Sequence, residues 1–183
     1  MSHFGFLAAE WPEIFEPAAK AEAWAVPDPR NACFYARRAL ELTVHWVYKH
    51  DANLTLPYQD HLSALIHEPD FRKVAGTAIF AKARVIKDLG NLAVHSTKPV
   101  RAFDAIMATK ELFHVLYWLA RTYARGAKPP DALRFDQTLL PKTAPVPPQT
   151  QNQLQQLEAS LRERDEKLAE LLSGRQALDA ELE

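Results

Sequence analysis

The sequence predicts an all-α protein: a helical bundle followed by a proline-rich linker and a C-terminal coiled-coil helix. Apolar residues recur at steps of three and four through most of the chain up to Tyr123, which is the period of amphipathic helices. No segment shows the alternation of a strand pair, and only 5 glycines stand against 13 prolines, with no glycine-rich phosphate-binding loop. After Asn152, leucines recur with the 3.5-residue period of a coiled coil.

The first two helices are marked by their spacing and by their punctuation. Apolar steps of three and four predict a helix near residues 10–24, which Pro17 is expected to kink or split. Asp28 is a good N-cap, and Pro29 suits a first helical position because its missing N–H costs nothing there. A second helix is therefore expected over residues 29–49.

Three more helices complete the expected bundle. A short one is predicted around residues 59–66, and a longer one over 71–94, where Gly76 interrupts the pattern and Thr77 suits a new N-cap. The last runs over 100–123 and is apolar enough to lie in the middle of the bundle. Its expected core residues are Phe103, Ile106, Met107, Leu112, Phe113, Leu116, Leu119 and Ala120.

Composition divides the chain into three parts. We expect a bundle over residues 1–140, closed by an extended strap at 131–140, then a stiff proline-rich linker at 141–152 and the start of a coiled coil at 153–183. A seam of this kind predicts self-association, although a helix lying on its own domain is the alternative. The seam leucines are Leu154, Leu157, Leu161, Leu168, Leu171, Leu178 and Leu182.

The bulk numbers describe an ordinary soluble protein. Hydrophobic residues make up 48% and charged residues 25%, and the formal net charge is −1, so any nucleic-acid surface has to be a local patch. The lone Cys33 cannot form an internal disulfide and is expected to be a small buried side chain. No secretory signal or membrane span is expected, and the cytoplasm is the predicted location.

Two polar stripes at helical spacing are the candidate functional residues. Arg38, Glu41, His45 and Lys49 follow one helix, with Arg37 beside them, and Arg84, Lys87, Asn91 and His95 follow a later one. Both could be solvated helix faces. Gly90 inside a helix costs about 1 kcal/mol relative to alanine, so close helix packing or a functional bend should compensate.

A basic bias accompanies the second stripe. Five cations are candidate nucleic-acid contacts: Lys82, Arg84, Lys87, Lys98 and Arg101. The same residues could form an ordinary surface neutralised by acidic neighbours in space. No histidine set has the spacing of a metal site, and no nucleophilic or paired-carboxylate arrangement can be read, so neither a metal nor a catalytic residue is predicted.

Two segments together resemble a known family: Ala36-Arg-Arg-Ala-Leu-Glu41 and Leu89-Gly-Asn-Leu-Ala-Val-His95. The chain resembles the HEPN-related helical domain of unknown function at the N-terminus of many type I restriction endonuclease R (HsdR) subunits. The resemblance implies that a nuclease domain and an ATP-driven translocase follow, with ATP and Mg²⁺ as cofactors of the parent protein and none in this chain. It also implies methyltransferase and specificity subunits as partners, and a role in phage defence.

Active HEPN ribonucleases place an Arg a few residues before a His, to activate the RNA 2′-hydroxyl and stabilise phosphate charge. Here Asn91 and His95 match that element, but the position of the Arg is Gly90, which argues against cleavage. A structural interpretation is preferred, in which Asn91 and His95 hydrogen-bond across the bundle to Arg37, Arg38 or Glu41.

Three functions follow from these patterns. The leading hypothesis is a noncatalytic docking domain of a restriction R subunit, whose coiled coil is a spacer to the absent motor. The second is a HEPN-type module that cleaves or binds RNA. The third is an oligomerisation module that acts through the heptads.

Overall fold

A computed structural model describes residues 2–145, 156 and 159, and within these residues it contains helices and no strand. The predicted all-α fold is thereby confirmed. The chain divides into two compact units, Met1–Ala144 and Pro145–Glu183. The predicted linker beyond Pro145 and the seven seam leucines lie outside the described residues. The elements are η1 (Gly5–Leu7), α1 (Pro12–Trp24), α2 (Pro29–His50), α3 (Leu62–His67), α4 (Pro69–His95), α5 (Ala102–Tyr123) and η2 (Gln137–Leu139).

The beginnings of the first two long helices follow the predicted punctuation. The Asp28 carboxylate accepts a hydrogen bond from the backbone N–H of Asn31 at 3.1 Å, and Pro29 occupies the first position of α2. Pro17 does not split α1 but lies inside it with its ring buried. Proline has no N–H and cannot donate to the preceding turn, which costs one helical hydrogen bond. The burial of its apolar ring offsets this cost.

Helix α4 is interrupted at Gly76, as the sequence predicted, but the N-cap of its second segment is one residue earlier than expected. Gly76 has φ 78° and ψ 163°, which separates segments 69–75 and 77–95. A residue at the N-cap has non-helical dihedrals, so the N-cap is Gly76. The prediction of Thr77 as the N-cap was wrong. Glycine is suited to this N-cap because a side chain is disfavoured at that φ.

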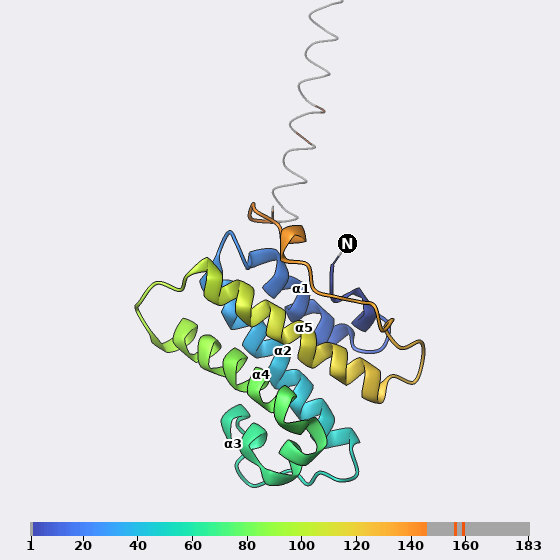
Figure 1. Cartoon of the computed structure of the whole chain (residues 1–183). Coiled ribbons are helices and arrows are strands. Elements are labelled where there is room, and N and C mark those ends of the chain that lie inside the picture. The colour runs from blue at the N-terminus through green and yellow to red at the C-terminus, as the bar shows by residue number, and fades with distance from the viewer. Residues whose placement is uncertain (1, 146–155, 157–158, 160–183) are drawn as a thin grey trace, which may run out of the picture. The chain divides into compact units, whose positions relative to one another are not determined.

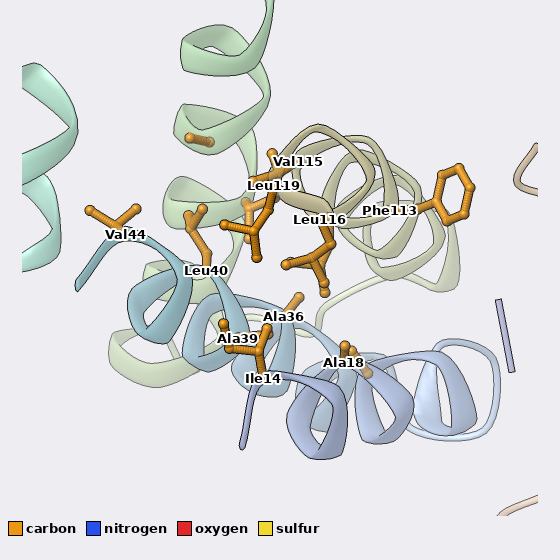
Figure 2. Close-up of a cluster of buried hydrophobic side chains, with 14 of the residues drawn as sticks. Ile14, Ala18, Ala36, Ala39, Leu40, Val44, Phe113, Val115, Leu116 and Leu119 are labelled. Carbon is orange, nitrogen blue, oxygen red and sulfur yellow. The ribbon is translucent and has the colours of Figure 1, made fainter. Parts of the chain in front are cut away.

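Helix α2 lies at the centre of the bundle and contacts α1, α3, α4 and α5 (Figure 1). Buried side chains from α1, α2 and α5 point toward one another, among them Ile14, Leu40 and Leu116 (Figure 2). Phe103 was predicted to lie in this core but is 65% exposed. It precedes the buried Ala105 by two positions, which places it on the opposite face of α5.

The N-terminal residues and the segment after α5 are tied together over the bundle. The buried carboxylate of Glu22 accepts hydrogen bonds from the Ser2 hydroxyl and from His3 Nδ1. His3 Nε2 accepts the backbone N–H of Asp136 at 3.1 Å, and its ring lies 4.7 Å from that of Phe135. The strap predicted at residues 131–140 thus crosses the bundle, although it includes the short helix η2.

Candidate functional site between α2 and α4

The closest approach of two helices in the candidate site is at Gly90, which is buried against α2. A Cβ added at Gly90 would lie 2.4 Å from Cβ of Arg37 and 2.7 Å from its Cδ. The stem of Arg37 therefore occupies the space that a side chain at position 90 would need. The close packing that the sequence suggested for this glycine is present.

Of the predicted polar cluster, Arg37 lies at this contact, and its members do not form a hydrogen-bonded network across the two helices. Arg38 and Glu41 form a 3.4 Å ion pair within one helix. Asn91 is partly buried and His95 is exposed, and no hydrogen bond joins either of them to Arg37, Arg38 or Glu41. Nε of Arg37 is buried and has no hydrogen-bond partner among residues 2–145. At this contact the two helices therefore meet by packing of the Arg37 stem along Gly90 and not by hydrogen bonds among the predicted polar residues.

Arg30 makes the polar connection between α2 and α4 that sequence reasoning missed. Its guanidinium donates to the carbonyl oxygens of Ala93 at 2.5 Å, Ser96 at 2.8 Å and Lys98 at 2.6 Å. These groups lie at the end of α4, where carbonyls lack helical partners and the helix dipole favours a cation. The position of Arg30 directly after Pro29, at the start of a predicted helix, could be seen in the sequence. The packing of α2 against α4, which supplies its partners, could not be predicted from the sequence.

Most of the five predicted nucleic-acid contacts are neutralised by acidic neighbours. Lys82 pairs with Glu111 at 2.5 Å, Lys87 with Asp88 at 2.6 Å, and Arg101 with Asp104 at 3.0 Å. The guanidinium of Arg84 lies 5.8 Å above the ring of Phe80. Lys98 is exposed and forms no ion pair within the described residues. This arrangement favours the ordinary compensated surface over a phosphate-binding patch.

Glu111 lies 29 residues from Lys82 in the sequence, so no local pattern connected it with this stripe. Burial acts to raise the pKa of its carboxyl, but the hydrogen bonds from Lys82 and His114 outweigh burial and hold the pKa below its ordinary value. The pair links α4 to α5. Lys82 thus has a structural role in the bundle.

Exposed apolar side chains flank the α2–α4 contact. Phe34 on α2 and Val94 on α4 are each 45% exposed. Phe34 lies one turn from both Arg30 and Arg38, and Val94 lies one turn after Gly90, so both border the line along which the helices meet. We refer to the partly buried Asn91 and the exposed residues here as the α2–α4 surface: Phe34, Arg38, Asn91, Val94, His95 and Lys98.

The sequence also led to predictions for the lone cysteine, for the metal-ligating residue types and for the helix lengths. Burial, with a smaller contribution from Asp104, raises the pKa of the Cys33 thiol to about 11, so this thiol stays protonated. Among residues 2–145, no three His, Cys, Asp or Glu side chains lie close enough together to hold a metal ion. Of the helices described, none is both long and apolar enough to cross a membrane.

The fold and this contact define a small helical-bundle domain whose polar stripes are organised by packing and by ion pairs. Residues 19–164 match the sequence model of the domain of unknown function DUF4145. The match covers most of the chain, which therefore belongs to this family. No curated protein and no solved structure matches the chain significantly.

Proposed function

We propose that this chain is a noncatalytic docking domain of a type I restriction endonuclease R subunit, with a HEPN-like bundle. Its partners would be the methyltransferase and specificity subunits of the restriction complex. ATP and Mg²⁺ would belong to the motor and nuclease domains of the parent protein and not to the bundle. The observation that carries the proposal is the contact of Arg37 with Gly90 beside the exposed α2–α4 surface.

The packing at Gly90 supports a noncatalytic role. A HEPN ribonuclease would carry its arginine at this position, but a Cβ there would already be 2.4 Å from Arg37. Real side chains do not approach so closely, so no larger residue fits unless the two helices separate. His95 thus lacks the arginine on its own helix that would complete a ribonuclease pair.

The composition of the α2–α4 surface supports docking to protein. It includes two large apolar side chains that are 45% exposed, Phe34 on α2 and Val94 on α4, together with polar residues of both helices. Exposed aromatic and aliphatic side chains beside polar groups are typical of protein interfaces. The nearby cations Lys82, Lys87 and Arg101 are held by carboxylates, which weakens the case for DNA as the partner.

A pull-down with the assembled methyltransferase–specificity complex tests the proposal, with a gel shift on duplex DNA in parallel. The full chain should be retained by the protein complex, and Phe34→Asp with Val94→Asp should abolish retention. Tyr58→Asp is the matched control because Tyr58 is a fully exposed aromatic residue in the segment between α2 and α3. Retention of neither protein nor DNA by the wild-type chain would contradict a docking role.

A further inference from the structure

A cleft lies at the end of the bundle where α1 begins and where α2 and α5 end. It has a volume of about 910 Å³, within the range of sites that bind small molecules. Its lining includes Trp11 directly before α1, Trp46 and His50 on α2, Tyr123 on α5, and the segment of residues 125–130 that follows α5. The α2–α4 surface involves the other half of α2, so the cleft is independent of the proposed docking role.

The helical wall of the cleft is a connected group of aromatic rings. Trp46 is at the centre, with its ring 5.5 Å from those of Trp11 and Tyr123 in edge-to-face arrangements. His50 stacks on Trp46 at 4.1 Å with an interplanar angle of 17°. The hydroxyl of Tyr123 donates to Asp51 at 2.6 Å, so this ring is fixed in place. The wall is therefore preformed.

His50 presents one ring face and one nitrogen that are free for a ligand. Its Nδ1 donates to the backbone carbonyl of Trp46 at 2.7 Å, which fixes the ring and leaves Nε2 as the other nitrogen. One face of the imidazole is covered by Trp46, and the residue as a whole is exposed. The outer face is available to stack on a flat ring.

The opposite wall carries two cations, Arg125 and Lys128, both exposed and neither in an ion pair within the described residues. The Glu10 carboxylate nearby accepts the backbone N–H groups of Arg125 at 3.0 Å and Gly126 at 2.8 Å. These hydrogen bonds hold the pKa of Glu10 below its ordinary value, so it serves as an anchor for the wall. Glu10 also lines the cleft and its charge acts on Arg125, so the two cations outnumber this carboxylate by one.

The same wall is anchored to α5 at its far end. The Tyr117 hydroxyl donates to the carbonyl of Pro130 at 3.1 Å, and Arg121 donates to that of Pro129 at 3.1 Å. Arg121 also pairs with Asp131 at 2.7 Å. Since the segment is held at both ends, its two cations are kept near the aromatic wall rather than on a free tail.

We propose that this cleft binds a nucleotide, with the base stacked on the outer face of His50 and the phosphate held by Arg125 and Lys128. A flat heteroaromatic ring matches the aromatic wall, and a phosphate matches two exposed cations that outnumber the one lining carboxylate, Glu10. Either a free mononucleotide or a nucleotide of a single strand presents this chemistry.

Isothermal titration of the full chain tests the proposal with four probes: AMP, adenosine, inorganic phosphate and a short oligodeoxyadenylate. AMP should bind saturably, and adenosine and inorganic phosphate should each bind at least about tenfold more weakly, because each lacks half of the recognised chemistry. If the oligonucleotide binds more than about tenfold tighter than AMP, the ligand is a strand, and comparable affinities identify the free nucleotide.

Two variants assign the binding to the cleft. Arg125→Ala with Lys128→Ala should weaken AMP about tenfold and leave adenosine unchanged, whereas His50→Ala should weaken both. Lys110→Ala with Lys142→Ala is the control, because it removes two exposed cations that do not line the cleft. The proposal is overturned if neither AMP nor the strand binds, or if the control pair weakens binding as much as the cleft pair.

Discussion

Replacing Gly90 by alanine tests whether the contact between α2 and α4 is as close as described. The added Cβ would lie 2.4 Å from Cβ of Arg37, an atom fixed to the backbone, so the helices have to move apart. Overpacking of this kind costs about 1–3 kcal/mol, and a contact with a backbone-fixed atom belongs at the upper end. Alanine returns about 1 kcal/mol through its helix propensity. We expect Gly90→Ala to lower the free energy of unfolding by about 2 kcal/mol.

Urea denaturation followed by circular dichroism measures this change, and the Arg37 background separates its causes. In Arg37→Ala the Cβ remains, so the penalty for Gly90→Ala should persist. In Arg37→Gly the obstacle is gone, and the coupling energy between the two positions should be about 2–3 kcal/mol. A Gly90→Ala protein more stable than wild type by about 1 kcal/mol would show propensity alone and would refute the close contact.

Three further predictions concern other parts of the chain. Lys82→Met should remove one cause of the depressed pKa of Glu111. Because that carboxyl stabilises the fold when it is ionised, the stability of the wild type should fall as the pH drops below about 4.5. Unfolding measured across pH should show a shallower acid dependence in the variant. Purified chain should leave single-stranded RNA uncut on a denaturing gel, and cleavage that His95→Ala abolishes would instead support the ribonuclease hypothesis. Asp in place of Leu161 and Leu168 should lower the sedimenting mass if the heptads pair between chains, and an unchanged mass would exclude that role.

Much of the bundle was predictable because local patterns determine helices. Asp28 and Pro29 mark the start of α2, and the apolar period marks its buried face. Gly90 was also noticed, since a glycine within a helix needs a compensating contact. The prediction for Phe103 was wrong because its apolar character does not decide its position: two residues before the buried Ala105, it lies on the opposite, exposed face of α5.

The site was less predictable because its contacts join distant segments. The hydrogen bonds of Arg30 reach residues 63–68 positions away, and Lys82 finds Glu111 in the next helix. Neither partner can be identified without knowing how α2, α4 and α5 are arranged. The aromatic cleft was missed for the same reason, since Trp11 before α1, Trp46 on α2 and Tyr123 on α5 are distant in the sequence.

The dissociation constant of the 183-residue chain for the methyltransferase–specificity complex tests the central claim most directly. Docking through the α2–α4 surface predicts saturable binding that weakens at least about tenfold in Phe34→Asp with Val94→Asp, because both charges would have to be desolvated at the interface. Tyr58→Asp should bind as the wild type does. Equal affinity of all three proteins would remove the α2–α4 surface from docking, and no binding by any of them would contradict the proposed function.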